Sequence, residues 1–442
     1  MKRRPPVRPT AFALLIVVAA AACTTSGDPV RPGPRSTFPS ALATMTSPTP
    51  TITTPVTLTV AFVETLDGED AADRVAPAFQ GARLAFSNAE VVTGLPVDVE
   101  VVAYDTEGDP ARTTEIAAEI ASTPEIVAAI GAPGLTRQAV LGDALDAAGV
   151  PWISLSGAGS GLGDRGWTGW RRLVTDQVVQ GTVLGQAVDD LKASGDGVCV
   201  MGDGTAPVRS LLGAAVGALD SRVVLRAAVP EAQPDVATAA GAVAEAGCGV
   251  VLWGGEGSLG AALRRQLVEE RLRRVVFVGS ERIRDQGFLE AVGEAGERAL
   301  ATCPCVDVST STDLAAQRFI QDYQSEFGLP PGPYAVEAWD AARMLVAAFR
   351  DGAVERGPVS TVLEVMTTFD GLASTYRFGF GGDLVDAAAS VRISRIEGGR
   401  WLELSTAGPQ REHGPGGSRA PGPVPPGIAL PPRVDSRRVT RG

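Results

Sequence analysis

Residues 97–155 read VDVEVVAYDTEGDPARTTEIAAEIASTPEIVAAIGAPGLTRQAVLGDALDAAGVPWISL. Polar and apolar residues alternate over Val97–Tyr104, which is typical of a strand, and Asp109-Pro110 is a typical helix start. The elements predicted next are a helix after Pro110, a strand over Ile126–Ile130, a helix over Thr136–Ala148 and a strand over Pro151–Leu155. Strands that alternate with helices across short loops predict a parallel sheet covered by helices on both faces.

The alternation continues on both sides of this segment. Upstream, Val56–Val63 predicts a strand and Pro77–Asn88 a helix. Downstream, a second series predicts helices over 178–193, 206–219, 234–246 and 259–271, and strands over 198–201, 222–229, 250–253, 275–278 and 299–306. Two such series predict an α/β fold of two doubly wound parallel-sheet lobes. Ligands bind such sheets beyond the carboxyl ends of the strands, so we expect a cleft between the lobes.

Both ends of the chain differ from this body. Basic residues precede the apolar run Ala11–Ala22, which is short for a bilayer span, so residues 1–22 predict a signal peptide. Small residues directly before Cys23 resemble a bacterial lipobox, which implies that Cys23 is acylated and becomes the mature N-terminus. The alternatives are an ordinary signal peptide or a retained transmembrane anchor. Residues 23–55, rich in Thr, Ser and Pro, predict a flexible tether, and residues 406–442 predict a disordered Pro/Gly/Arg tail.

The composition weakens most catalytic hypotheses. The 442 residues include 1 His, His413 in the tail, and the lysines are Lys2 and Lys192. A body without histidine cannot hold a Ser-His-Asp triad or a His-ligated zinc, and Lys192 does not stand in a Walker-type motif. The net charge of −12 is concentrated in residues 56–405, because both ends are basic. Such an acidic body repels nucleic acid.

Two loops at expected carboxyl ends of strands are rich in glycine and hydroxyl groups. They are Gly131–Thr136 and Ser154–Ser160. Backbone amides and side-chain oxygens in such loops can contact a small polar ligand, although plain helix capping explains each loop equally well.

The body resembles the type I periplasmic binding proteins of ABC importers, and in particular the branched-chain amino-acid-binding group. The resemblance covers Val56 to about Leu404 and rests on the motifs Gln80–Ala85, Asp105–Pro110, Ile130-Gly131, Ala148–Ser154, Gly254-Gly255 and Tyr334–Ala342. It implies two lobes joined by a three-segment hinge. Lobe one would comprise residues 56–175 and 307–375, and lobe two residues 176–306 and 376–405.

The resemblance also implies a ligand site, position by position. Glu281 falls where a lobe-two acid holds a ligand ammonium. Arg74 replaces an aromatic residue at the mouth of lobe one, where its guanidinium can bind a carboxylate. The remaining candidates are Leu135 and Thr136 after the third strand, Ser156, Gly157 and Ala158 after the fourth, Glu256 in a lobe-two loop, and Trp339 where a tyrosine often faces the cleft. Leu135 and Ala158 stand where hydroxyl residues are usual.

Four body cysteines, Cys199, Cys248, Cys303 and Cys305, are an even set, so an extracytoplasmic location makes disulfides plausible. Three pairings are possible. The expected strand order 2-1-3-4-5 makes the strands of Cys199 and Cys248 neighbours, which favours that pair. A bridge within Cys303-Pro-Cys305 would be strained if both thiols lay on one face of a strand. A four-cysteine metal site is a weak alternative, because Cys-x-x-Cys spacing is absent.

A competing motif is Gly255-Glu-Gly257-Ser-Leu-Gly260, which follows a strand and opens a helix as dinucleotide-binding loops do. It stands in the third strand–helix unit of its lobe rather than the first, which disfavours a nucleotide.

The resemblance implies a solute-binding lipoprotein outside the cytoplasm, held on the outer face of the cell membrane by its lipid anchor alone. It would capture a small polar ligand, an amino acid or an amide- or carboxylate-like solute, and deliver it to an ABC permease. No enzyme activity, cofactor, metal or nucleic-acid partner is expected. The alternatives are a non-transporting ligand sensor or envelope-interaction protein on the same fold, and an exported enzyme that uses carboxylates only.

Overall fold

The computed structural model describes residues 56–65, 74–87, 97–135, 137–191, 197–219, 223–230, 232, 234–309 and 311–406. The predicted signal peptide, Cys23, the tether up to residue 55, Thr136 and the tail beyond residue 406 lie outside the described residues. In the described part of the chain, no helix is both long and apolar enough to cross a membrane.

The first sheet has five parallel strands in the order β2-β1-β3-β4-β5. These strands are β1 (Val56–Glu64), β2 (Val97–Asp105), β3 (Ile126–Gly131), β4 (Trp152–Ser154) and β5 (Trp170–Arg172). Side chains on β1 alternate between two cores: Val60 and Phe62 face one cluster, while Ala61 and Val63 face another. Both faces of the sheet are therefore covered, as the sequence predicted.

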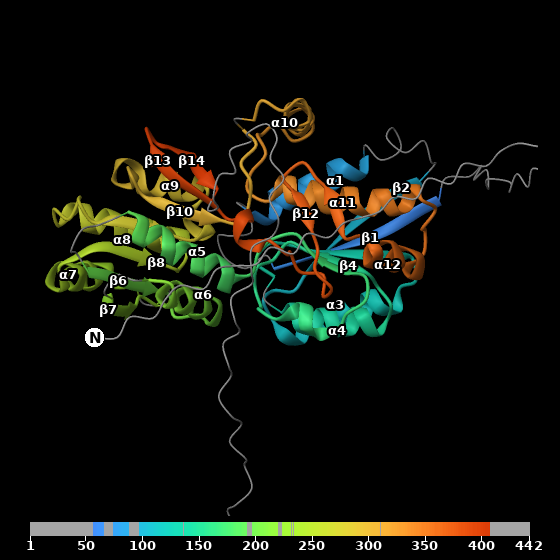
Figure 1. Cartoon of the computed structure of the whole chain (residues 1–442), viewed down its shortest axis with the longest axis horizontal. Coiled ribbons are helices and arrows are strands. Elements are labelled where there is room, and N and C mark those ends of the chain that lie inside the picture. Colours follow the sequence, from blue (N-terminus) through green and yellow to red (C-terminus); the bar gives the residue numbers. More distant parts are fainter. Residues whose placement is uncertain are drawn as a thin grey trace, which may run out of the picture. The chain divides into compact units, whose positions relative to one another are not determined.

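Helices from distant parts of the sequence cover this sheet. They are α1 (Ala76–Ser87), α3 (Pro110–Ser122), α4 (Gln138–Ala147), α11 (Ala335–Arg350) and α12 (Arg356–Val365). Figure 1 shows α1 beside α11, and the two helices pack closely. The close approach requires a glycine, because a Cβ added at Gly81 would lie 2.0 Å from the backbone oxygen of Ala335.

The second sheet has seven strands in the order β14-β13-β10-β9-β8-β6-β7. They are β6 (Gly197–Gly202), β7 (Val223–Ala228), β8 (Cys248–Trp253), β9 (Val276–Gly279), β10 (Leu300–Cys303), β13 (Arg392–Glu397) and β14 (Arg400–Thr406). The first five are parallel and repeat the expected 2-1-3-4-5 order, while β13 and β14 add antiparallel strands at one edge. The prediction of two doubly wound lobes is confirmed.

Helices α5 (Gln177–Asp190), α6 (Ala206–Gly217), α7 (Val236–Ala246), α8 (Gly257–Glu269) and α9 (Gln286–Val292) belong to the second series. Two apolar clusters again lie on opposite faces of the sheet. Aspartates start several helices: the side chain of Asp109 accepts a hydrogen bond from Ala111 N, and Asp176 accepts from Val178 N and Val179 N. Such caps satisfy amide groups that have no partner inside the helix.

Some elements were not predicted or were wrongly bounded. The sequence did not indicate β5, α9 or the hairpin of β11 (Thr368–Asp370) and β12 (Thr375–Arg377). The strand predicted over 299–306 ends at Cys303, because the chain bends at Pro304 before it leads to α10 (Leu314–Phe327). Proline cannot donate a hydrogen bond to a neighbouring strand, so it favours this ending.

The described part of the chain contains two disulfides. Cys199 on β6 pairs with Cys248 on β8, as favoured from the expected strand order. Cys303 pairs with Cys305, a bridge that the sequence had disfavoured. That expectation assumed a continuous strand, whereas the bend at Pro304 brings the two Cα atoms to 5.0 Å, within the usual range for a disulfide.

Candidate functional site

Loops from both sheets enclose a small cavity at the carboxyl ends of the strands. Its lining from the first lobe includes Pro133 and Gly134 after β3 and the loop 155–158 after β4, together with Arg74 and Tyr334 at the starts of α1 and α11. Its lining from the second lobe includes Glu281 and Arg282 after β9, together with Gln177, Gln180, Pro207 and Pro304. The cavity measures about 30 Å³.

Buried hydrogen bonds hold the loop after β4 in one conformation. Ser156 Oγ donates to the backbone oxygen of Leu135 at 2.8 Å and accepts from Ala158 N at 3.2 Å. Gln138 Nε2 donates to the backbone oxygens of Ser156, at 3.2 Å, and of Ala158, while Ser154 Oγ donates to Gln138 Oε1. The Ser156 hydroxyl therefore already donates its only proton to a protein group. Its effect on the cavity is to fix the conformation of the loop.

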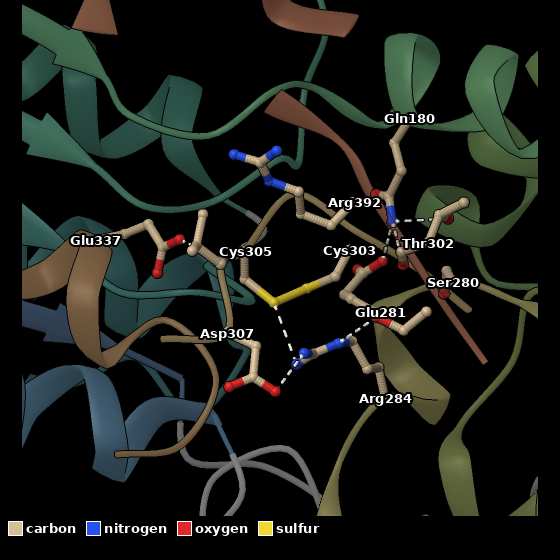
Figure 2. The surroundings of a disulfide bond; sticks show 12 residues. Gln180, Ser280, Glu281, Arg284, Thr302, Cys303, Cys305, Asp307, Glu337 and Arg392 are labelled. Atoms are coloured by element: carbon tan, nitrogen blue, oxygen red, sulfur yellow. Dashed lines mark hydrogen bonds and ion pairs between the residues drawn. A yellow bond between two sulfur atoms is a disulfide. The ribbon is translucent and has the colours of Figure 1, made fainter. Parts of the chain in front are cut away.

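Glu281 begins the short 3-10 helix Glu281–Ile283 directly after β9. Figure 2 shows the Gln180 side chain reaching toward it from α5. Gln180 Nε2 lies 2.5 Å from Glu281 Oε2 and 3.2 Å from the backbone oxygen of Thr302. Because Gln180 is 1% exposed, its amide holds the Glu281 carboxylate from the protein interior.

Arg74 extends into the cavity and is 3% exposed. Burial lowers the pKa of its guanidinium, and the nearby Arg282 lowers it further. Glu281 acts in the opposite direction and raises the pKa of Arg74, as do Tyr334 and Asp285 more weakly. Arg74 and Glu281, which come from different sheets, therefore attract each other across the cavity.

Tyr334 is a lining residue that the sequence did not single out. It is 4% exposed, and burial raises its pKa well above the usual value, with Glu281 adding to the effect. Its hydroxyl therefore stays neutral and can donate a hydrogen bond. Its backbone has φ 64° at the start of α11, a left-handed conformation that is uncommon for an aromatic residue. Strain of this kind costs on the order of 1–3 kcal/mol and persists where the surroundings enforce it.

Arg282 also lines the cavity and forms an ion pair with Glu256, which precedes α8. Glu256 itself does not line the cavity. The helix start at Gly255–Gly260 is closely packed, since a Cβ added at Gly260 would lie 2.7 Å from the indole nitrogen of Trp253. Trp253 Nε1 in turn donates to the backbone oxygen of Glu256 at 3.1 Å.

Five of the nine candidates line the cavity together: Arg74, Ser156, Gly157, Ala158 and Glu281. Leu135 instead lies fully buried in an apolar cluster. Trp339 packs edge-on against Phe319, with ring centroids 5.2 Å apart. The apolar side chain of Leu135 and the aromatic surface of Trp339 explain these positions, since both gain more from a core than from a polar cavity.

Sequence reasoning missed Tyr334, Arg282 and Gln180. Tyr334 stood in a quoted motif and Arg282 directly follows Glu281, so both had a signal in the sequence. Gln180 had none, because only the packing of α5 against β10 brings it to Glu281.

The segment that leads out of β10 touches the cavity through Pro304. Figure 2 shows the Cys303–Cys305 bridge between Arg284 and Glu337. The Arg284 guanidinium lies 3.2 Å from an Asp307 oxygen, 3.2 Å from Ser394 Oγ and 3.9 Å from Cys305 Sγ. Val306 N donates to Glu337 Oε1 at 2.7 Å, which ties this segment to α11.

The described residues also line larger hollows, and the first of these includes Leu173 and Pro304, which directly follow β5 and β10. One of about 680 Å³ is lined mainly by the 373–377 and 384–392 segments, and one of about 870 Å³ mainly by the proline-rich 329–333 loop and the 306–309 segment. Both hollows also hold side chains of either charge, Glu337, Asp386, Arg377 and Arg392 in the first and Asp285, Asp307, Arg284 and Arg400 in the second, but none of the described candidate residues lines them. Among the described residues, no three His, Cys, Asp or Glu side chains form a group that could hold a metal ion.

Comparisons with known proteins agree with this architecture. A family model described as "Periplasmic binding protein" matches residues 57–400. The fold is similar to a leucine binding protein of Thermotoga maritima, with a TM-score of 0.68 and 17% identity over 80% of this chain and 99% of that chain. A comparison with curated protein sequences gave no significant match.

Two further solved structures have the same fold. A branched-chain amino acid transporter substrate binding protein of Streptococcus pneumoniae, in complex with isoleucine, has a TM-score of 0.68 and 16% identity over 79% of this chain and all of that chain (100%). A solute binding protein of R. palustris, in complex with benzoate, has a TM-score of 0.66 and 17% identity over 80% of this chain and 97% of that chain. These neighbours are binding proteins rather than enzymes.

Proposed function

Because the chain belongs to the periplasmic binding protein family, we propose that it is an extracytoplasmic lipoprotein that captures a small polar ligand between its two lobes. One observation carries the proposal: charged side chains from both sheets, Arg74 and Glu281, converge on one buried cavity at the carboxyl ends of the strands. The ligand would then pass to an ABC permease in the membrane. Acylated Cys23 would hold the protein on the outer face of the cell membrane.

The lining residues have different roles in this proposal. Arg74 presents a planar guanidinium, which suits a ligand carboxylate. The backbone of the loop Ser156–Ala158 and the Tyr334 hydroxyl contribute uncharged polar groups, and Glu281 provides the opposing charge. Because the cavity measures only about 30 Å³, the lobes must open by a hinge motion before a ligand can enter.

The ligand class is proposed from the cavity and the structural neighbours together. The neighbours' ligands, isoleucine and benzoate, both carry a carboxylate. The buried Arg74 offers this chain a partner for such a group.

The lobe boundaries at residues 175, 306 and 375 belong to the proposal as well, since each lies close to where the chain passes between the sheets.

Thermal unfolding tests the proposed function. The purified chain is screened against amino acids, amides, short peptides, mono- and dicarboxylates, purines and urea-like solutes. A ligand at 100 times its dissociation constant adds about 2.7 kcal/mol of stability, which raises the melting temperature by a few degrees. Glu281→Ala should change the size of the shift, while Glu269→Ala, on the exposed end of α8, should leave it unchanged. A ligand shift equal in both variants would contradict the assigned site.

A second candidate is a non-transporting sensor or envelope-interaction protein on the same fold. The small cavity favours it, together with the Ser156 hydroxyl that is already bonded to Leu135. Absence of any shift across the panel would support this candidate, and the next search would be for a protein partner. Permease and ATPase genes beside the coding sequence would instead support transport.

A further inference from the structure

We propose that Arg74 supplies, from the protein itself, the positive charge that faces Glu281, so that this site binds carboxylates without an amino group in preference to α-amino acids. The inference rests on the proposed function and narrows its ligand class. The inferred ligand differs from those of two structural neighbours. One of them is named for leucine and the other holds isoleucine, and both of these ligands are α-amino acids.

The first step is the position of Arg74 relative to Glu281. Both side chains line a cavity of about 30 Å³, so the guanidinium and the carboxylate are neighbours across it. Arg74 is 3% exposed, which leaves water little room to screen the attraction. The Glu281 carboxylate also accepts a hydrogen bond from the Gln180 amide at 2.5 Å. Glu281 therefore already faces a cation and an amide donor, and a ligand ammonium would compete with both.

The second step is the balance of charge around the cavity. The described charged residues that line the cavity are Arg74, Arg282 and Glu281. Glu256, the partner of Arg282, lies outside the lining. Asp285 caps α9 by accepting from Phe288 N at 2.6 Å and also lies outside it. Because Arg282 is paired with Glu256 and Arg74 faces Glu281, an ammonium placed here would meet an acid that already has a cationic neighbour, whereas a carboxylate would be attracted by the Arg74 guanidinium.

The third step is the supply of donors for an anion. Guanidinium presents several N–H groups in a fixed fork that fits both oxygens of a carboxylate. Burial keeps the Tyr334 hydroxyl protonated, so it can donate to an anion on the same side of the cavity. The described lining thus holds donors for a carboxylate, and its described acid, Glu281, faces Arg74.

Matched ligand pairs test the inference. The full chain is titrated by calorimetry with leucine and 4-methylpentanoate, and with phenylalanine and 3-phenylpropanoate. Each pair shares a side chain and a carboxylate and differs in the ammonium group. We expect the des-amino acid of a pair to bind at least tenfold more tightly than the amino acid. The amide 4-methylpentanamide should bind more weakly than 4-methylpentanoate, because it lacks the negative charge.

Variants of Arg74 test its role. Arg74→Gln should lower the preference for the des-amino acid at least tenfold, since Glu281 then faces the ligand ammonium directly. Arg74→Lys retains the charge and should keep the preference. Arg83→Gln, an exposed arginine on α1, is the matched control and should behave as the parent chain. The comparison of ligand pairs on the parent chain decides the matter even if Arg74→Gln does not fold.

The outcomes separate this inference from the proposed function. Tighter binding of leucine than of 4-methylpentanoate would overturn the inference and leave the proposed function standing. Binding of uncharged solutes alone would do the same. No binding by either member of any pair to the folded chain would overturn the inference, and the broader thermal screen would then decide whether the chain binds a solute at all.

Discussion

Glu337 provides a stability prediction that can be worked through from its surroundings. Its side chain is 2% exposed on α11, and Oε1 accepts a hydrogen bond from Val306 N at 2.7 Å. Oε2 has no hydrogen-bond partner among the described residues. Burial raises the pKa of Glu337 from 4.5 to about 7, and Asp340 raises it further, while hydrogen bonds and Arg284 partly oppose the shift. The folded protein therefore holds a proton on Glu337 that the unfolded chain releases.

The sign of the pH dependence follows from this difference. Because the folded-state pKa is the higher one, Glu337 contributes stability that is fully present below pH 4.5 and is lost as the pH rises through about 7. Between pH 5 and pH 8 the loss amounts to about 2.5 kcal/mol of unfolding free energy. Glu337→Gln keeps an acceptor for Val306 N and cannot ionise, so it should remove this part of the pH dependence.

Urea unfolding at pH 5, 6, 7 and 8 measures the effect. The parent chain should lose more stability between pH 5 and pH 8 than Glu337→Gln does, by about 2.5 kcal/mol. Glu326→Gln, at an exposed position on α10, is the control and should retain the parent pH dependence. Equal pH dependence in the parent and in Glu337→Gln would refute the assignment of a raised pKa to Glu337.

Two further predictions concern covalent and packing constraints. Replacing both Cys199 and Cys248 with serine should cost about 4 kcal/mol of unfolding free energy, because the bridge spans 49 residues. Replacing Cys303 and Cys305 should cost less than half as much, because that loop is only 2 residues long; urea midpoints compare the two. Gly81→Ala should lower the unfolding free energy by about 1–3 kcal/mol, because its methyl group would lie 2.0 Å from a backbone oxygen of α11.

Each of these predictions has a control or a contradicting result. Gly213→Ala on α6 meets nothing within 4 Å and should be neutral or stabilising by up to about 1 kcal/mol. If Gly81→Ala lowers the unfolding free energy no more than Gly213→Ala does, the close approach of α1 to α11 is contradicted. A larger loss from the Cys303–Cys305 pair than from Cys199–Cys248 would contradict the loop-entropy reasoning.

The order of strands and helices was predictable because it depends on local signals. Period-two alternation, as over Val97–Tyr104, and a capping aspartate such as Asp109 act within a few residues of chain. Strand–helix alternation then leaves few topologies, so the fold class and the neighbouring positions of Cys199 and Cys248 followed as well. The hairpin of β11 and β12 was not predicted, because a strand of three residues is too short to show a clear alternation of polar and apolar residues.

The candidate site was only partly predictable. The sequence placed glycine- and hydroxyl-rich loops at the carboxyl ends of strands, and the residues Ser156–Ala158 do line the cavity. It did not reveal that the backbone oxygen of Leu135 and the backbone amide of Ala158 would take up the hydrogen-bonding capacity of the Ser156 hydroxyl. A hydroxyl in a loop chooses among partners from several elements, and those partners are set only when the elements pack.

The amino-acid sequence by itself therefore determined the two doubly wound lobes. It also determined that the loops at the carboxyl ends of their strands form the candidate site. The tertiary structure alone decided that Arg74 turns inward, that Trp339 packs against Phe319, and that Gln180 reaches Glu281. The physical reason is range. Periodicity and capping act along the chain, whereas burial and charge pairing depend on which residues, far apart in sequence, share the same few ångströms.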